Sequence, residues 1–309
     1  MKFFKPKFWD KNQISIYSIL LFPISLIIQF LNRFKKLFER NKKFSIPVLC
    51  VGNIYIGGTG KTPLCIELYK ILNDLNKNPV FIKKKYTAHR DETSLLKKIG
   101  PICEGPNRTI ALENATKKEY DVAILDDGFQ DFSIKKDLSI ICFNEMQWIG
   151  NGFTIPSGPL REDLQTLDRA DCVVINGKKN INIENKILEK NKSIKIFYSR
   201  YKAKNIDSIK NKKVICFAGI GNPINFFNLL EKEDIKIIEK ISFPDHYNYS
   251  EMDMKKLLKK TEENKAILLT TEKDYLRINE NFRKNINFLK IETVIENRDL
   301  LINEIKKII

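Results

Sequence analysis

From about residue 47 onward, short apolar runs alternate along the chain with segments of helical spacing. The runs are expected to form strands at Val48–Val51, Val80–Ile82, Val122–Leu125, Leu138–Phe143 and Cys172–Ile175. Helices are expected at Leu64–Leu75 and Leu95–Lys98, where apolar side chains recur every three to four positions. Because the strands are apolar throughout, they predict a parallel sheet covered on both faces.

The alternation continues and predicts a second, smaller α/β domain. Its strands are expected at Ile194–Tyr198, Val214–Ala218, Ala266–Thr270 and Ile286–Ile291. Helices at Ile224–Leu230 and Met252–Lys260 separate its later strands. Residues 200–212 are rich in lysine and asparagine and are expected to be the linker. We therefore predict a first α/β domain over residues 45–202 and a second over 203–309.

Residues 1–44 follow a different pattern. An almost entirely apolar run extends from Ile14 to Leu31, about the length of a marginal membrane span, and basic residues flank both ends. We expect a membrane-associated helix, kinked near Pro23, that lies in or along the inner leaflet with its lysines on lipid phosphates. A full span is the second interpretation, and a buried core helix is the third. We do not expect a signal peptide, because the basic run and the strand at residue 48 follow without a small-residue cleavage site.

The composition is that of a folded chain, since 43% of the 309 residues are hydrophobic and 30% are charged. The net charge of +16 suits nucleic acid, anionic membranes or phosphate-bearing ligands. Lysine, asparagine and isoleucine share AT-rich codons, so the charge permits these partners without identifying one. The six cysteines include no C-x-x-C pair, which argues against zinc and redox chemistry and for a reducing cytoplasm.

Candidate chemistry begins directly after the first expected strand, where glycines lead into Lys61 and Thr62. In a phosphate-binding loop, backbone N–H groups wrap phosphate oxygens, the lysine reaches the outer phosphates and the hydroxyl holds Mg²⁺. A strand, this loop and a helix in that order predict a parallel-sheet domain of the phosphate-loop NTPase type. Tyr55 stands where the usual pattern has glycine, so the glycines after it must supply the flexibility. The expected nucleotide contacts are Ile56, Gly57, Gly58, Thr59, Gly60, Lys61, Thr62 and Pro63.

Further acids and a basic residue follow later strands. Asp126 and Asp127 end an apolar strand, a place where nucleotide-binding sheets hold their metal, although an Asp-Gly turn is the simpler interpretation. A loop rich in glycine and proline ends in Arg161 and Glu162. Arg161 could clamp a phosphate, and Glu162 could add a metal ligand.

The two histidines, His89 and His246, both fall in expected loops. Asp91 or Thr93 could simply cap the helix that follows His89. Residues 271–274 are either a further polar site or a capping turn. Taken singly, each of these features has an ordinary structural explanation.

Together, however, the motifs resemble one family, the tetraacyldisaccharide 4′-kinases. The matching segments run in the family's order and comprise Val51–Asn53, Gly57–Pro63, Leu125–Gln130, Gly150–Gly152, Pro156–Glu162, Arg169–Asp171, Phe217–Pro223, Phe243–Tyr247 and Thr270–Asp274. The resemblance implies a two-domain α/β kinase that uses ATP and Mg²⁺. Its reaction would phosphorylate the 4′-hydroxyl of tetraacyldisaccharide 1-phosphate to give lipid IVA, at the cytoplasmic face of the inner membrane.

The resemblance also implies roles for individual residues. Asp91 matches the base that activates the sugar hydroxyl, with Arg90 in place of the family's glycine, and His246 matches the histidine that supports it. We expect this pair to form when the two predicted domains close on the substrate. Lys61 completes the expected catalytic set. The expected metal contacts are Thr62, Asp126, Asp127 and Glu162.

The chain departs from the family pattern at two places. Lys83-Lys84-Lys85-Tyr86 stands where the family has Ser-Arg-Gly-Tyr-Gly, and Asp131 stands where a histidine is usual. A lysine can still meet a phosphate, but as a point charge without arginine's fork. We expect substrate contacts from Lys84, Gln130 and Arg161.

Two other protein classes compete with a glycolipid kinase. A GTPase or ATP-driven maturation factor would need a base-recognition motif such as Asn-Lys-x-Asp, and residues 271–274 lack the asparagine. A nucleic-acid-dependent ATPase would need aromatic residues within a basic groove, whereas the basic and aromatic cluster here adjoins the apolar N-terminal run. The expected partners are therefore the glycolipid and an anionic membrane surface, with no nucleic acid, for a monomeric enzyme.

Overall fold

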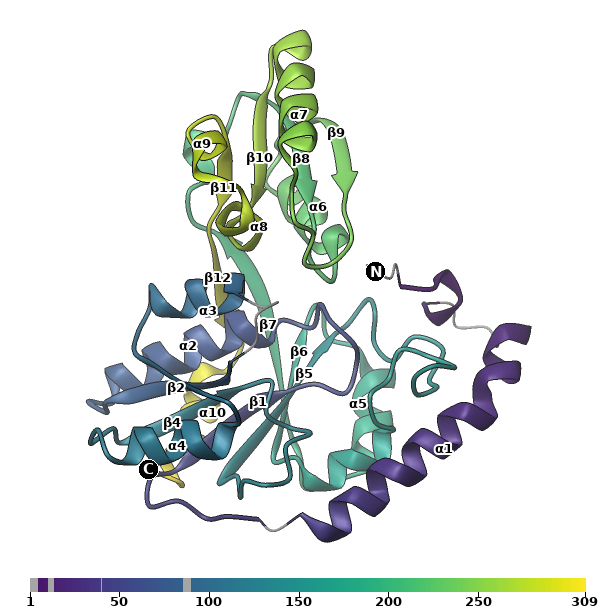
Figure 1. Ribbon diagram of the computed structural model, residues 1–309, viewed down its shortest axis with the longest axis vertical. Helices are drawn as coiled ribbons and strands as arrows, with labels where there is room; N and C mark the ends of the chain where they lie inside the picture. Colours follow the sequence, from purple (N-terminus) through teal and green to yellow (C-terminus); the bar gives the residue numbers. More distant parts are fainter. Residues whose placement is uncertain (1–4, 11–13, 40, 86–89) are drawn as a thin grey trace. The chain divides into compact units, whose positions relative to one another are not determined.

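The computed structural model describes residues 5–10, 14–39, 41–85 and 90–309. These residues form two compact units (Figure 1). The larger unit comprises Lys5–Lys85, Ile99–Arg200 and Ile295–Ile309, and the described part of the smaller unit comprises 90–98 and 201–294. A single boundary at 202/203 was predicted, but two segments cross it. Residues 90–98 belong to the smaller unit, and residues 295–309 belong to the larger unit.

The larger unit is built on one sheet. Its strands are β1 (Val48–Gly52), β2 (Pro79–Lys84), β3 (Ile102–Gly105), β4 (Val122–Asp126), β5 (Leu138–Asn144), β6 (Cys172–Asn176), β7 (Lys195–Ala203) and β12 (Ile291–Ile295). Within the described residues their order is β12-β7-β6-β5-β1-β4-β2-β3, and every pair from β7 to β3 is parallel. The parallel sheet predicted from the apolar runs is thereby confirmed.

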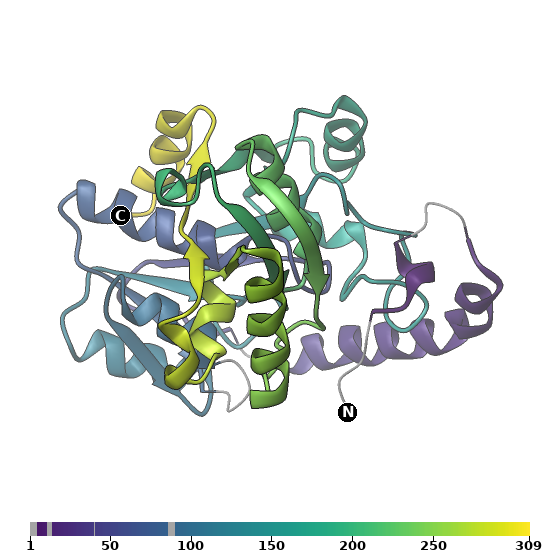
Figure 2. The same cartoon turned by 90° about the horizontal axis from the view of Figure 1, so that it is seen from above.

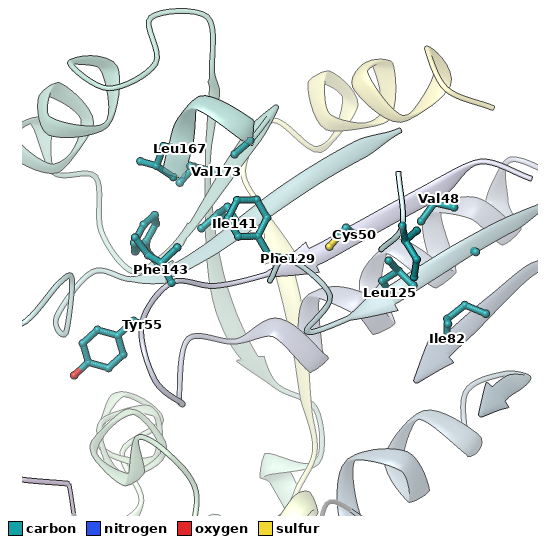
Figure 3. Close-up of a cluster of buried hydrophobic side chains, with 14 of the residues drawn as sticks. Val48, Cys50, Tyr55, Ile82, Leu125, Phe129, Ile141, Phe143, Leu167 and Val173 are labelled. Carbon is teal, nitrogen blue, oxygen red and sulfur yellow. The ribbon is translucent and has the colours of Figure 1, made fainter. Parts of the chain in front are cut away.

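Helices surround this sheet. They are η1 (Lys7–Trp9), α1 (Ile16–Phe38), α2 (Lys61–Asp74), α4 (Arg108–Thr116), η2 (Leu164–Arg169), α5 (Ile181–Leu188) and α10 (Arg298–Lys306). Every residue of β1, β4 and β5 is buried, and because alternate side chains of a strand point to opposite faces, both faces must be covered. In Figure 3, Cys50, Phe129 and Ile141 belong to the apolar cluster on one of these faces.

The smaller unit repeats the α/β plan on a smaller scale. Its strands are β8 (Lys213–Ala218), β9 (Lys236–Ser242), β10 (Ile267–Thr271) and β11 (Asn287–Leu289), all parallel in the order β11-β10-β8-β9 within the described residues. Its helices are α3 (Arg90–Lys97), η3 (Ile206–Ser208), α6 (Pro223–Lys232), α7 (Glu251–Asn264), α8 (Glu272–Arg277) and α9 (Glu280–Arg283). Helix α3 packs against α8, although the two are distant in sequence.

Two expectations about the junction between the units are wrong. The strand expected at Ile194–Tyr198 belongs to the first sheet as β7, not to the second group of strands. The stretch 200–212 is not an open linker, because β7 continues into it and Ala203, Ile206 and Ile209 are buried in an apolar cluster. Its many lysines hid the apolar residues spaced between them.

Helix α1 carries its polar and apolar faces the opposite way from a helix in a soluble protein. Ser18 and Ser25 are completely buried, whereas Leu20, Ile27 and Phe30 are 68%, 60% and 67% exposed. The helix is long and apolar enough to cross a membrane, and only 11% of its most apolar 18-residue stretch is buried in the protein. A buried core helix, the third interpretation of this segment, is therefore excluded. Figures 1 and 2 show α1 along the outside of the larger unit.

Candidate active site

The glycine-rich loop between β1 and α2 has the backbone that a phosphate-binding loop requires. Gly57, Gly58 and Gly60 have φ angles of 73°, 63° and 93°, a left-handed region that other residues adopt only with strain. The buried side chain of Asn53 donates a 2.9 Å hydrogen bond to Thr59 Oγ1, which holds the loop in this conformation. The glycines after Tyr55 thus supply the conformational freedom, as the sequence indicated.

Tyr55 itself is a structural support. It is fully buried and packs in the apolar cluster of Figure 3. Its hydroxyl donates a 2.7 Å hydrogen bond to Asp10 Oδ1, and Lys5 lies over its ring with Nζ 4.6 Å from the centroid. Its backbone pairs with Leu160, so this residue connects the loop to the segment that ends at Arg161.

Lys61, Thr62 and the two acids at the end of β4 converge at the beginning of α2. Thr62 Oγ1 lies 3.3 Å from Asp126 Oδ2, and Lys61 Nζ lies 3.6 Å from Asp127 Oδ1. Arg161 Nη1 donates to both carboxylate oxygens of Asp127, at 2.9 and 3.0 Å. Burial alone would raise the pKa of Asp127, but the charges of Lys61 and Arg161 outweigh it and lower the pKa to about 2. Asp127 is therefore ionised at neutral pH.

Glu162 lies in a different part of this network. Its Oε2 accepts a 2.5 Å hydrogen bond from Arg169, whose guanidinium is 4.4 Å from the ring centroid of Phe129 and 4.8 Å from that of Phe132. Burial raises the pKa of Glu162. Gln130 donates a 2.8 Å hydrogen bond to the carbonyl of Asn53. The structure thus pairs Glu162 with Arg169.

Thr62 and Asp126 form a small donor set that suits Mg²⁺. A hydroxyl and a carboxylate side by side offer the hard oxygen ligands that this ion prefers. Within the described residues there is no group of three or more histidine, cysteine, aspartate or glutamate side chains that could hold a metal. A Mg²⁺ ion bound here would therefore share its remaining positions between phosphate oxygens and water, as in phosphate-loop enzymes.

Sequence reasoning missed one member of this cluster. Lys83 is only 5% exposed, and its Nζ lies 3.0 Å from Asp126 Oδ2. The expected substrate contact Lys84 is its exposed neighbour at the end of β2. The signal was available in the strand pattern, because alternation along β2 turns Lys83 and Lys84 to opposite faces.

The smaller unit holds a second charged cluster around Asp91, in the first turn of α3. Asp91 is 5% exposed. Its Oδ2 lies 3.5 Å from His246 Nδ1, 2.8 Å from Arg277 Nη2 and 3.8 Å from Lys273 Nζ. Burial opposes ionisation of Asp91, but the hydrogen bond with His246 and the charges of Lys273 and Arg277 hold its pKa well below the usual range.

The pair of Asp91 and His246 is thus complete within the smaller unit. Both residues belong to that unit, so they meet without a closure of two domains, contrary to the expectation from sequence. The backbone of His246 has a φ angle of 54° and its N–H donates to the carbonyl of Gly219 at 3.0 Å. His89, the other histidine, lies outside the described residues.

A fully buried carboxylate supports this pair from behind. Asp274 accepts hydrogen bonds from Tyr249 at 2.9 Å, from Thr271 at 2.7 Å and from the Gly219 amide at 3.1 Å. It also accepts a 2.9 Å bond from Arg277, which is thereby aimed at Asp91. Residues 271–274 are indeed a capping turn, since Thr271 caps α8. No sequence motif marked Arg277 for this role.

The two clusters supply complementary chemistry. One offers a loop of N–H groups, a lysine and a hydroxyl beside a carboxylate, which is the equipment for holding a nucleotide's phosphates. The other offers an ionised, buried carboxylate with a histidine beside it, which is the equipment for accepting a proton from a hydroxyl. Fold and site together define a phosphate-loop α/β phosphotransferase.

The chain belongs to the tetraacyldisaccharide-1-P 4′-kinase family, whose model matches residues 17–309. It is 42% identical over 315 residues to the tetraacyldisaccharide 4′-kinase of Pelagibacter ubique, covering 100% of this chain and 99% of that relative. It is 36% identical to the enzyme of the same name from Rickettsia akari, covering 99% and 98%. The resemblance and the kinase class inferred from the motifs are confirmed.

A solved structure agrees with the fold. LpxK from Aquifex aeolicus, crystallised in complex with ATP, matches with a TM-score of 0.72 and 27% identity, covering 95% of this chain and 99% of that one. The expected α/β kinase fold is thereby confirmed. The same assignment decides against the GTPase and the nucleic-acid-dependent ATPase as classes for this chain.

Proposed function

We propose that this protein transfers the γ-phosphoryl group of ATP to the 4′-hydroxyl of tetraacyldisaccharide 1-phosphate, with Mg²⁺ as cofactor. The observation that carries the proposal is the presence, in one chain of this family, of a phosphate loop with paired acids and a buried carboxylate with its histidine. The ATP complex of the Aquifex aeolicus relative supports the choice of nucleotide.

The larger unit is proposed to hold the nucleotide. The backbone N–H groups of residues 56–62 would wrap its phosphates, and Lys61 would neutralise charge on the outer oxygens. Mg²⁺, held at Thr62 and Asp126, would supply further neutralisation of the phosphate oxygens. Arg161, fixed by Asp127, stands beside this position as a second cation that can contact a phosphate.

The smaller unit is proposed to activate the acceptor. Asp91 is held ionised by Lys273 and Arg277, so it is ready to accept the proton of the sugar hydroxyl at neutral pH. A carboxylate of low pKa is a weak base, which suits a loose phosphoryl-transfer transition state with little attack by the hydroxyl. His246 would orient the carboxylate. The remaining substrate contacts proposed are Lys84 and Gln130.

Helix α1 is proposed to lie in the membrane interface without crossing it, at the cytoplasmic face of the inner membrane. Its polar face is fastened to the larger unit: Ser25 Oγ donates to the Thr154 carbonyl at 3.0 Å, and Gln29 donates to Thr154 Oγ1 at 2.7 Å. Ser18 Oγ accepts a bond from Asn151 and Arg33 donates one to Asp163, which extends this attachment over about 22 Å of helix, at 1.5 Å per residue.

A helix held along its length cannot leave the protein to span a bilayer without breaking these bonds. Its exposed apolar side chains can instead dip into one leaflet, where the lipid substrate resides. The lysines at its C-terminal end would lie near anionic lipid phosphates. This arrangement suits a monotopic, monomeric enzyme that meets ATP from the cytoplasm.

The proposal is tested by incubating the full-length protein with γ-labelled ATP and tetraacyldisaccharide 1-phosphate in mixed micelles, followed by thin-layer separation. We expect one labelled lipid that carries a second phosphate. A Lys61→Ala variant serves as the matched control for contaminating kinases and should give no labelled lipid. Absence of that product with the wild type, under conditions where the protein binds ATP, would reject the acceptor.

A further inference from the structure

The buried ion pair of Lys83 and Asp126 lies at the position where the larger unit would hold a metal. The register of β2 and β4 places Ile82 beside Leu125, and both side chains belong to the apolar cluster of one sheet face. The next residues, Lys83 and Asp126, therefore point to the opposite face. There they are 5% and 1% exposed, with Nζ and Oδ2 3.0 Å apart.

The pair is connected directly to the phosphate loop. The oxygen of Asp126 that Lys83 contacts also lies 3.3 Å from Oγ1 of Thr62, the residue after Lys61. Two contacts thus separate the Lys83 ammonium from the loop's own hydroxyl. The same carboxylate oxygen is shared between a fixed cation of the protein and the hydroxyl proposed to hold Mg²⁺.

We propose that Lys83 is a built-in counter-cation for Asp126, which allows the loop to bind a nucleoside triphosphate without Mg²⁺. This inference rests on the proposed ATP site and adds a property to it. In a loop that lacks such a cation, a bare carboxylate at Asp126 repels the phosphates until a metal ion screens it. Here the lysine already neutralises the carboxylate in a place that water barely reaches.

The second consequence concerns the metal. Lys83 occupies one side of the oxygen that Mg²⁺ would use, so the ion gains less from Asp126 than it would from an unpaired carboxylate. Nucleotide and Mg²⁺ should therefore help each other's binding only weakly in the wild type. Removing the ammonium should weaken metal-free nucleotide binding and strengthen the coupling between nucleotide and Mg²⁺.

The test is the ratio of dissociation constants for a fluorescent ATP analogue measured in EDTA and in MgCl₂, with full-length protein in neutral detergent and no lipid. We expect a wild-type ratio within about tenfold, and an increase of at least about tenfold in Lys83→Met, in the range of typical coupling factors. Lys85→Met, which removes an exposed lysine two residues further on, is the matched control and should leave the ratio unchanged.

A double variant guards against a misfolded single variant. Lys83→Met leaves Asp126 buried without its cation, so it can lose stability. In Lys83→Met/Asp126→Asn both charges are gone, and metal-free binding should return to within a few-fold of the wild type. If Lys83 acted by touching a phosphate itself, the double variant would stay weak, and the counter-cation proposal would be rejected.

The wild-type measurement alone can also overturn the proposal. Binding that is easily measured with MgCl₂ and undetectable in EDTA would show that Lys83 does not replace the metal's screening. An unchanged ratio in a folded Lys83→Met variant would have the same meaning. Absence of binding in both buffers would instead reject the proposed ATP site, so the two failures are distinguishable.

Discussion

The phosphate-loop cluster of the larger unit and the Asp91 cluster of the smaller unit are built in opposite ways. The first comes from consecutive loop residues and from strand ends that a parallel sheet brings to one edge. The second joins residue 91, residue 246 and two residues of α8, 273 and 277, and no local pattern connects these three segments. A phosphate-binding loop can therefore be predicted from consecutive residues, whereas a buried base is assembled by the tertiary fold from residues distant in sequence.

The clusters also differ in charge. In the larger unit, Lys83 pairs with Asp126, and both Lys61 and Arg161 contact Asp127. The cations thus outnumber these two carboxylates before any phosphate arrives. In the smaller unit, His246, Lys273 and Arg277 surround one buried carboxylate and keep it ionised. The first arrangement suits the binding of negatively charged phosphates. The second keeps a buried carboxylate in its ionised form.

The largest effect is expected from Lys61→Ala, which removes charge neutralisation from the phosphate-loop cluster alone. We expect a loss of at least about a thousandfold in kcat, because electrostatic stabilisation is the main contribution in phosphoryl transfer. The fold should survive, since α2 does not depend on this side chain. Rates of label transfer, together with a thermal melt, check both statements. Near-normal turnover would remove the loop from the mechanism.

The Asp91 cluster is examined by Asp91→Ala, which should lower kcat by about a hundred- to ten-thousandfold, the usual range for a general base. The KM for ATP should change little, because the proposed nucleotide contacts lie in the other cluster. His246→Ala should cost less, and the double variant should be barely worse than Asp91→Ala alone. Steady-state kinetics of the three variants decide this. Fully multiplicative losses would mean that the two residues act independently.

The two clusters also differ in how much of each could be predicted from the sequence. The loop, Asp126 and Asp127 could be predicted because strand ends of a parallel sheet share an edge. Strand alternation separates Lys83 from Lys84, but it does not identify Asp126 as the partner of Lys83. Arg277 could not be predicted at all, because its importance comes from burial beside a carboxylate that another segment supplies. The stretch near Ile206 differs from the predicted linker for a related reason. Its apolar residues are few, and only the packing shows that they are buried.

The membrane face of α1 should affect the lipid and not the nucleotide. Leu20→Glu together with Ile27→Glu places charges on the exposed apolar face and leaves the buried serines intact. We expect weaker sedimentation with anionic vesicles and an apparent KM for lipid raised by about tenfold or more, given the apolar area lost to the bilayer. Lys43→Glu alone should have a smaller effect. Unchanged sedimentation of the double variant would place the anchor elsewhere.

The smallest effect is expected in the pH dependence. The pKa of Asp91 is held below the usual range. Protonation of Asp91 therefore limits kcat/KM only when the pH falls well below the pKa of an ordinary aspartate. Arg277→Gln removes one of the holding charges, and the pKa of Asp91 should rise towards its ordinary value. The acid limb of the pH–rate profile should then move to higher pH by about one unit. An acid limb that stays in place would show that Arg277 does not tune the base.

The central claim is that the smaller unit's carboxylate acts on the 4′-hydroxyl while the larger unit delivers the phosphoryl group. The most direct measurement compares label transfer from γ-labelled ATP to tetraacyldisaccharide 1-phosphate and to its 4′-deoxy analogue, with wild type and Asp91→Ala. We predict rapid labelling of the natural lipid by the wild type, almost none by the variant, and none of the deoxy lipid by either. Labelling of the deoxy lipid, or full activity in Asp91→Ala, would contradict the account.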